Sequence, residues 1–384
     1  MTSERADEIY LDNAATTKLR PAAIAAFEQS FVSRYGNAAG HHKAARRAKN
    51  ALEEAREHAA MLIGAGRPHD IVFTSGGTES DNLAVVGSAL ASERRTVIVS
   101  SIEHKAVLES AGALSRLGYS TRLVPCDGNG VIHPDAVATL VDSDTAVVSV
   151  MAANNETGTF EPIEAIVESV RSVDKTIPVH TDAVQYFVAK PLDVTAIGAD
   201  LVSLSGHKFG GPTGVGLLYV SSSTHIEPVL VGGSQEAGRR PGTSNVASIV
   251  AMVAAMADVV SSRQGFAETA GVERDAFERA LLEGDPSITV TAKDVDRLTH
   301  FSHVRIPRVL AETLLIRLDA AGVFAAAGSA CQSGAVEPSH VLTAMGMPSE
   351  YAEQCVRFTF GWDTQPGDGV VAARRVLGII EALR

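Results

Sequence analysis

Cysteine is scarce in this sequence of 384 residues, and the few cysteines lie far apart. The chain contains three of them, Cys126, Cys331 and Cys355. An odd and widely spaced set without a C-x-x-C pair predicts neither a disulfide framework nor a structural zinc site. The adjacent His41 and His42, and His300 with His303, have no acidic or thiol partner nearby, so we expect no metal site.

Long apolar runs and an excess of positive charge are also missing. The first residues, MTSERADEIYLD, carry acids and bases instead of the apolar core of a signal peptide, and no later run reaches the ~18 apolar residues of a membrane span. Lysine and arginine number 33 against 45 acidic residues, which gives a formal net charge of -12. General binding to nucleic-acid backbones needs clustered basic residues. We therefore expect a cytoplasmic protein with no membrane contact and no general affinity for nucleic acid.

The residues that are present describe an α/β fold. Hydrophobic residues make up 45% of the chain and charged residues 20%, as in soluble enzymes with a packed core. Residues 43–63 place alanine and leucine at helical spacing among charges, which predicts an amphipathic helix. Between residue 40 and about residue 220, helical stretches alternate with short β-rich runs, as in βα units around a mostly parallel sheet. The expected strands are 71–74, 97–100, 121–124, 146–150, 178–180, 201–204 and 215–220.

The last third of the chain reads differently, because the alternation weakens near residue 260. Residues 250–283 predict a long helical connection, followed by a mixed region with strands near 300–306 and 355–360. The length of the chain favours two domains with a cleft between them. We place a large domain at residues 16–259 and a smaller one in residues 1–15 together with 260–384.

A glycine pair marks the first candidate site, in the segment IVFTSGGTESDNLAV. The segment runs from a predicted buried strand through Gly76 and Gly77 into a helix expected to begin at Thr78 or Glu79. Backbone amides at such a helix start can hold a phosphate. A plain strand-to-helix turn capped by Thr78 explains the same residues equally well. The pattern matches neither the dinucleotide fingerprint nor the Walker motif, so a nucleotide is disfavoured.

Three further segments place chemically active side chains after predicted strands. In ADLVSLSGHKFGGPTGVGLLYV, Lys208 lies inside a glycine-rich turn, where a lysine of lowered pKa can form a Schiff base. In PVHTDAVQ, Asp182 can pair with a protonated pyridine nitrogen. His104 follows VIVSS, and Asn155 lies in MAANNETG. Each residue alone is explained by a helix cap or a solvated loop. The glycine-pair turn, Asp182, Lys208 and His104, however, all fall at the predicted carboxyl ends of one sheet, where ligands bind.

These motifs resemble the NifS/IscS-like cysteine desulfurases of the class V aminotransferase group. The resemblance runs nearly end to end, through YLDNAATT, TSGGTESDN, EHKAVL, NNETG, HTDAVQ, SGHKFGGPTGVG, RRPGTSN, GSACQSG and VRFTFG. It implies a fold-type-I enzyme that binds pyridoxal 5'-phosphate and forms a homodimer.

The resemblance also implies a role for each residue around the cofactor. Lys208 would carry the cofactor covalently, His104 would stack on the pyridine ring, Asp182 would pair with the ring nitrogen, and Gln185 would contact the phenolic oxygen. The implied phosphate contacts are Gly77, Thr78, Ser205, His207 and, from the partner subunit, Thr243.

For the substrate L-cysteine, the resemblance implies that Arg357 binds the carboxylate and that Asn155 adds a second contact at the cofactor. The alternation in CVRFTFG agrees, because it puts Arg357 and Thr359 on the strand face opposite to the apolar residues. A solvated strand arginine is the plainer interpretation of Arg357.

Cys331 is the expected sulfur carrier, because it lies among the small residues of GSACQSGAVEPSHVL, which suit an exposed and mobile loop. Cys355 reads as a core residue and Cys126 as incidental. The implied reaction converts L-cysteine to L-alanine and leaves a persulfide on Cys331 for an acceptor protein. A selenocysteine lyase or another class V enzyme is the alternative. Iron–sulfur assembly, tRNA thiolation and DNA phosphorothioation all stay open as destinations of the sulfur.

Overall fold

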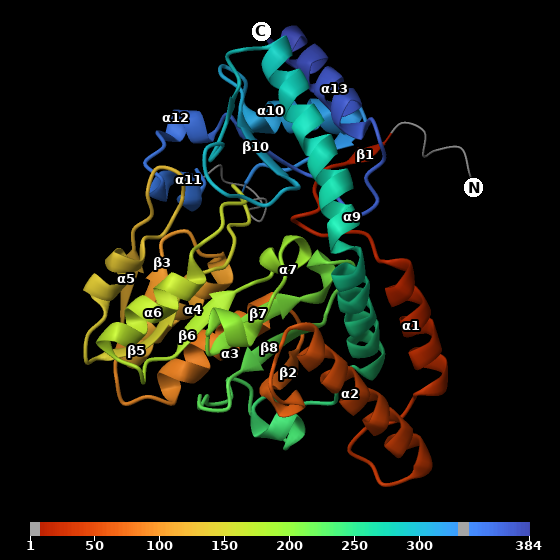
Figure 1. Ribbon diagram of the computed structural model, residues 1–384, viewed down its shortest axis with the longest axis vertical. Coiled ribbons are helices and arrows are strands. Elements are labelled where there is room, and N and C mark those ends of the chain that lie inside the picture. Colours follow the sequence, from red (N-terminus) through yellow and green to blue (C-terminus); the bar gives the residue numbers. More distant parts are fainter. Residues whose placement is uncertain (1–7, 329–337) are drawn as a thin grey trace.

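A seven-stranded sheet forms the centre of the protein, whose computed structural model describes residues 8–328 and 338–384 (Figure 1). The strand order is β2-β8-β7-β6-β5-β3-β4. All neighbouring strands run parallel except β8, which is antiparallel to both β2 and β7. The α/β class with a mostly parallel sheet is thereby confirmed. The strands are β2 (Ile71–Thr74), β3 (Thr96–Ser100), β4 (Ser120–Val124), β5 (Thr145–Ser149), β6 (Val179–Asp182), β7 (Leu201–Ser205) and β8 (Gly216–Val220).

These strands form where the sequence concentrates β-branched residues, whose side chains pack well on a pleated surface. The runs TVIVS and TAVVS of β3 and β5 are buried on both faces. Helices cover the sheet, as expected for parallel strands. They include α3 (Gly77–Leu90), α4 (Lys105–Ala113), α5 (Pro134–Leu140), α6 (Ile163–Val173), α7 (Tyr186–Ala189) and α8 (Val194–Ile197).

One long helix, α9 (Val246–Gly284), connects the sheet region with the C-terminal part of the chain. It packs against α1 (Pro21–Ser33), α2 (Lys43–Leu62) and α13 (Asp368–Leu383), and Figure 1 shows it running from α1 and α2 up to α13. Part of α9 has a mean hydropathy of 1.6 and is long enough to cross a membrane by length and composition, although half of that part is buried inside the protein. The long helical connection predicted for residues 250–283 is confirmed by α9, which begins four residues earlier and ends one residue later. Its burial is that of a core helix.

The C-terminal part contains two small sheets. One has the order β12-β10-β9, all antiparallel, and the other pairs β1 with β11 in parallel. Their bounds are β1 (Ile9–Tyr10), β9 (Thr289–Val290), β10 (Phe301–Arg305), β11 (Val323–Phe324) and β12 (Cys355–Thr359), with helices α10 (Ala311–Ala320), α11 (His340–Ala344) and α12 (Ser349–Ala352) around them. The pairing of β1 with β11 brings the start of the chain to this region. The proposed boundary between residues 259 and 260 falls inside α9.

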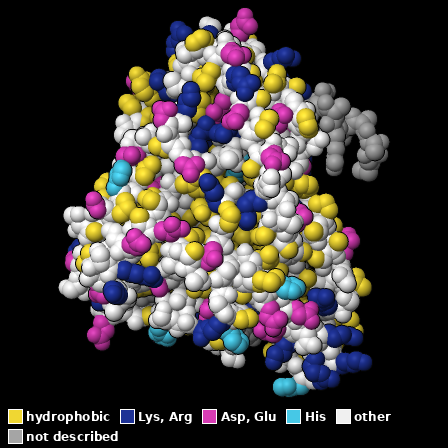
Figure 2. Space-filling view, viewed as in Figure 1, with side chains coloured by type: hydrophobic (Ala, Val, Ile, Leu, Met, Phe, Trp, Pro, Cys, Tyr) yellow, Lys and Arg dark blue, Asp and Glu magenta, His cyan; other side chains and the backbone are white. Residues whose placement is uncertain are grey.

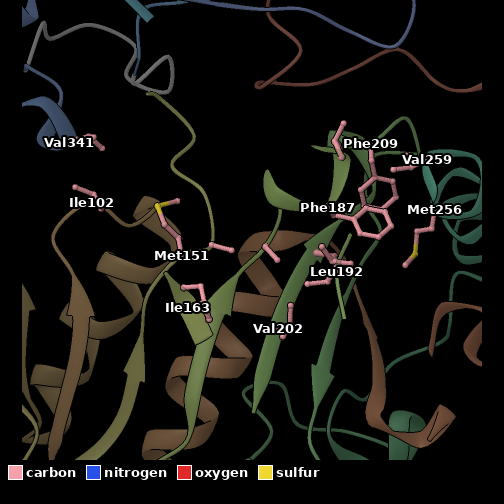
Figure 3. Packing of buried hydrophobic residues seen from close by; sticks show 14 of the residues in the cluster. Ile102, Met151, Ile163, Phe187, Leu192, Val202, Phe209, Met256, Val259 and Val341 are labelled. Atoms are coloured by element: carbon pink, nitrogen blue, oxygen red, sulfur yellow. The ribbon is translucent and has the colours of Figure 1, made fainter. Parts of the chain in front are cut away.

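Aromatic packing fixes α9 against the sheet. The rings of Phe187 and Phe209 lie 5.2 Å apart in an edge-to-face arrangement, and Figure 3 shows them beside Met256 and Val259 of α9. Phe209 directly follows the short 3-10 turn Gly206–Lys208. The core therefore anchors the turn that carries Lys208.

Candidate active site

A cavity of about 390 Å³ opens where β6 and β7 end. Of the site residues predicted from the sequence, all except Thr243 and Cys331, which are described below, line this cavity. The predicted residues that line it are Gly77, Thr78, His104, Asn155, Asp182, Gln185, Ser205, His207, Lys208 and Arg357. They come from segments up to 280 positions apart in sequence, so the fold is what brings them together.

Lys208 occupies the turn directly after β7. Its Nζ donates hydrogen bonds to the backbone carbonyls of Ala14, over 2.6 Å, and Ala15, over 2.8 Å. Gln185 donates to the same Ala14 carbonyl over 2.9 Å. Residues 14 and 15 belong to the motif YLDNAATT. The N-terminal segment thereby closes one side of the cavity and positions the amine.

Asp182 ends β6 at the inner wall of the cavity. Its Oδ1 accepts a hydrogen bond from the Val184 amide over 2.8 Å. Burial raises the pKa of Asp182, while the nearby His104 and Lys208 oppose that rise. A partner with positive charge in the cavity would favour the ionised carboxylate.

A second polar layer lies beneath Asp182. Two residues earlier on β6, the ring of His180 is held between the hydroxyls of Ser149, at 2.8 Å, and Ser203, at 2.9 Å. Complete burial lowers the pKa of His180 to about 3, so this ring is neutral. Burial, and then the neighbouring Asp182, raise the pKa of Asp81 well above its usual range.

Two histidines, His104 and His207, line the cavity. His104 caps α4, and its Nδ1 accepts a hydrogen bond from the Ala106 amide over 3.0 Å, which leaves the proton of the neutral ring on Nε2. Burial lowers the pKa of His104. The ring of His207 lies 3.2 Å from the Thr16 hydroxyl, and burial together with Lys208 lowers its pKa to about 4. Both rings are therefore neutral at pH 7.

The glycine pair forms the start of α3, one residue earlier than the sequence had suggested. Gly76 has a φ of 154°, a backbone conformation that residues with a side chain rarely adopt. A Cβ on Gly216 of β8 would lie 2.8 Å from the Gly76 Cα, so the turn also requires glycine on the neighbouring strand. With Gly77, Thr78 and Ser205 in the cavity wall, the free amides of this helix start open into the cavity.

Arg357 reaches the cavity from β12. Its side chain is 4% exposed, and Nη1 donates to the backbone carbonyl of Asn155 over 2.7 Å, while Nη2 donates to Oδ1 of Asp12 over 2.9 Å. The predicted alternation of the strand is confirmed, because Thr359 contacts the same N-terminal segment through the Ala14 amide at 2.9 Å, whereas Phe358 packs on Phe277. The interpretation as a solvated strand arginine is wrong.

Two predicted site residues do not appear in this cavity. Thr243 lines a separate hollow of about 220 Å³, together with Ser75, Arg240 and Asn245. Cys331 lies outside the described residues. Gly328, just before the segment that contains Cys331, does line the cavity.

The other two cysteines have unreactive surroundings. Cys355 is buried on β12, and burial raises the pKa of its thiol to about 12. Cys126 is half-buried, and burial raises its pKa as well. The thiolate form, which is the nucleophile, is therefore disfavoured at both positions.

Metal ligation has no support within residues 8–328 and 338–384, where no group of three or more His, Cys, Asp or Glu could hold an ion. The histidines considered in the sequence have other surroundings. His42 caps α2 by accepting from the Ala45 amide over 3.2 Å. Burial lowers the pKa values of His300 and His303 to about 3, and His303 bonds to the Thr291 hydroxyl over 2.9 Å.

Several lining residues were missed by sequence reasoning. They are Ala14, Ala15, Asp81, Lys105, Met151, Glu156, Val184 and His340. Three of them lie within two positions of a predicted site residue: Lys105 in EHKAVL, Glu156 in NNETG and Val184 in HTDAVQ. The available signal was their position in a motif at the end of a strand. That position does not show which side chain of the motif faces the cavity.

The comparisons with known proteins place the chain in a class of enzymes. It belongs to the family described as aminotransferase class-V, whose model matches residues 9–368. Enzymes of this family depend on pyridoxal 5'-phosphate. The chain is therefore a pyridoxal-phosphate-dependent enzyme.

Individual relatives narrow the class. The chain is 40% identical over 379 residues to the cysteine desulfurase IscS of Dictyoglomus turgidum, which covers 98% of this chain and 95% of the relative. It is 38% identical to the cysteine desulfurase NifS of Azotobacter vinelandii, covering 98% and 94%. A solved structure named NifS-like protein is 32% identical, with a TM-score of 0.91 over 98% of this chain and 100% of that chain.

The cavity residues fit pyridoxal 5'-phosphate. The cofactor needs an amine for its aldehyde, an anion for its ring nitrogen and a group of donors for its phosphate. Lys208, the buried carboxyl group of Asp182 and the free amides at Gly77 and Thr78 are three such groups in the wall of one cavity.

Proposed function

We propose that this protein is a cysteine desulfurase that takes sulfur from L-cysteine and carries it on Cys331. One observation carries the proposal: a single cavity brings together Lys208, Asp182, His104 and Arg357. An amine, a carboxyl group, an imidazole and a guanidinium are the groups required to bind the cofactor and the carboxylate of an amino acid.

The cofactor would be held by residues from several elements. Lys208 would form the covalent link, Asp182 would pair with the ring nitrogen, and His104 would lie against the ring. Gln185 and Asn155 would bind the oxygen on the ring. Donors for the phosphate would be Gly77, Thr78, Ser205 and His207. When bound, pyridoxal phosphate supplies an aldehyde and an electron-withdrawing ring that weakens bonds next to the amine of the substrate.

The substrate would be oriented by Arg357, which can hold a carboxylate with parallel hydrogen bonds. This contact directs the α-carbon toward Lys208, whose amine, once released, would remove the α-proton. His104 keeps its neutral-ring proton on Nε2, because the Ala106 amide occupies Nδ1. The Nε2–H group can therefore donate a hydrogen bond.

Sulfur transfer would then occur at Cys331. The thiolate of Cys331 attacks the sulfur of the substrate, so that an S–S bond forms and the C–S bond breaks. The electron pair of the broken bond stays with the carbon, which takes up a proton and leaves as alanine. The raised pKa values of Cys126 and Cys355 support this choice of carrier, because both thiols are poor nucleophiles.

A second subunit would complete the site. Thr243 lies in a hollow of its own, separate from the cavity of Lys208. Such a position suits a residue that binds the cofactor phosphate of the partner subunit. Just before this segment, Val229, Leu230 and Val231 are 41%, 50% and 89% exposed, which supports a homodimer that covers them. The final acceptor of the sulfur would be a protein in the cytoplasm.

A persulfide assay tests the proposed function. Cys331→Ser should still bind the cofactor and L-cysteine, because Lys208 and Arg357 are untouched, but it should form neither alanine nor sulfide. Brief exposure of the native protein to L-cysteine should add one sulfur to the peptide with Cys331, as measured by mass spectrometry, and dithiothreitol should remove it. The proposal fails if Cys331→Ser turns over at the native rate or if the sulfur is found on Cys126 or Cys355.

A further inference from the structure

The guanidinium of Arg357, which lines the cavity, already has an anionic partner in Asp12. The bond from Nη2 to Oδ1 of Asp12 is 2.9 Å long, and the two side chains are only 4% and 23% exposed. Charges attract more strongly at such partly desolvated positions than at an open surface. Asp12 is therefore an effective counter-ion for Arg357.

The backbone around Asp12 keeps this carboxylate in place. Asp12 lies opposite Thr359 in a parallel bridge, next to the strand that carries Arg357. Its carbonyl accepts hydrogen bonds from the Ala15 amide, over 3.1 Å, and from the hydroxyl of Tyr10, over 3.2 Å. Burial, followed by the Asp12 carboxylate, raises the pKa of Tyr10 to about 12. Asp12 is thus a fixed source of negative potential beside Arg357.

Arg357 keeps donors for a second anion. A guanidinium has about five N–H donors, and the bonds to Asp12 and to the Asn155 carbonyl use two of them. Nε is buried and has no hydrogen-bond partner among the described residues. A carboxylate that enters the cavity can therefore bind Arg357, but it meets a charge that Asp12 has partly neutralised.

We propose that Asp12 is a binding residue that acts through Arg357 and limits how tightly the cavity holds the carboxylate of an amino acid. This inference rests on the proposed function, because it takes Arg357 as the group that binds that carboxylate. The substrate L-cysteine and the product L-alanine carry the same carboxylate, so Asp12 weakens both by the same factor. A lower affinity for the product lets it leave after each turnover. The effect belongs to uniform binding, which alters KM without accelerating the chemical step.

The charge of Asp12 can be removed without removing its oxygen. In Asp12→Asn, the amide oxygen can still accept the bond from Nη2, but the negative charge is gone. The dissociation constant for L-alanine should then fall about tenfold, which corresponds to about 1.4 kcal/mol. The KM for L-cysteine should fall in parallel. Binding of L-alaninamide, which lacks the carboxylate, should not change. Calorimetric titration of the holoenzyme measures all three ligands apart from turnover.

Asp363→Asn is the matched control. Asp363 is also 23% exposed, and it pairs with Lys18 instead of Arg357, so the substitution makes the same change in net charge. Its affinity for L-alanine should equal that of the native protein. Asp12→Ser, which also removes the charge and keeps an oxygen, serves if Asp12→Asn does not fold.

The two hypotheses fail separately. If the native holoenzyme binds L-alanine more tightly than L-alaninamide, but the folded Asp12 variants bind L-alanine no better, the role of Asp12 is overturned. If the native protein binds the acid and the amide equally well, the assignment of Arg357 in the proposed function is overturned instead.

Discussion

Buried carboxyl groups are a recurrent feature at the residue scale, and Glu161 is the clearest example. It lies beyond the cavity wall, 6% exposed, with Oε2 accepting from the Ile132 amide over 2.7 Å. Oε1 is buried without a partner among the described residues. Burial raises the pKa of Glu161 from 4.5 to about 8. The folded protein therefore retains a proton there that the unfolded chain releases.

This retained proton predicts a pH dependence of stability. Glu161 contributes its full stabilisation below pH 4.5, where both states are protonated, and the contribution is lost as the pH rises from there to about 8. Glu161→Gln keeps a carbonyl oxygen for the Ile132 amide but has no proton to lose. Relative to the native protein, the variant should gain stability between pH 5 and 8, by more than about 1 kcal/mol. Urea unfolding midpoints across this range measure the difference.

Glu164→Gln, at an exposed position three residues further on, is the control for that measurement. Its unfolding midpoint should follow the native curve. Parallel curves for native protein and Glu161→Gln would show that Glu161 is ionised in the folded state as well.

At the scale of elements, one carboxyl group contacts both described flanks of residues 329–337. Glu156 is 1% exposed, and its Oε2 accepts from the Ser339 hydroxyl over 2.6 Å. A Cβ on Gly328 would lie 2.1 Å from the same oxygen, so only glycine fits there. The Ser339 hydroxyl also caps α11 by accepting from the Leu342 amide over 3.3 Å. One hydroxyl therefore stabilises a helix and a buried acid.

Ser339→Ala should remove both contacts. Loss of a helix cap costs about 1 kcal/mol, and an unpaired buried carboxyl group adds roughly 1–3 kcal/mol. The melting temperature should therefore fall. Desulfuration should also slow, because Gly328 and Glu156 line the cavity. Asp193→Ala is the control, since Asp193 caps α8 through the Thr195 and Ala196 amides and does not line the cavity. If both variants slow the reaction equally, the contact with Glu156 has no special role.

The central strands were predictable because each is a run of β-branched or apolar residues that ends at a polar cluster. The predicted bounds of β2 match, and those of β3 to β8 differ by one or two residues at one or both ends. The strands β1 and β11 have two residues each and exist only because their partners lie across the chain, so no local pattern indicates them. For the same reason, no local pattern indicated the roles of Asp12 and Glu156. The hydrogen bond from Arg357 to Asp12 spans 345 positions, and the one from Ser339 to Glu156 spans 183.

At the scale of the whole molecule, the notable features are the distribution of charge and the expected assembly into a dimer. Figure 2 shows acidic and basic side chains interspersed over one face of the protein, as expected for a chain with 33 basic and 45 acidic residues. The separation of Thr243 from the cavity predicts that the active form is a dimer with composite sites, because an isologous contact would complete both sites at once.

The activity of mixed dimers tests the prediction of composite sites. A heterodimer of a Thr243→Ala subunit and a Lys208→Ala subunit has one site with both native residues and one with neither. Co-refolded mixtures should therefore exceed the mean activity of the two variants alone. Lys208→Ala mixed with the double variant, which contains no native site, is the control. Additive activities, or a monomer in solution scattering, would contradict the composite site.

The hydrogen bonds between the N-terminal segment and β12 have a consequence for biosynthesis. Asn13 and Ala14 bind Thr359 across nearly the whole chain, and Asp12 binds Arg357 in the same region. The ribosome makes the first partners of these pairs at the start of translation and the second near its end. The seven-stranded sheet can form earlier, since β8 ends at Val220. A nascent chain can thus form its sheet before its substrate site is complete, and a truncated translation product that lacks β12 would contain Lys208 without Arg357.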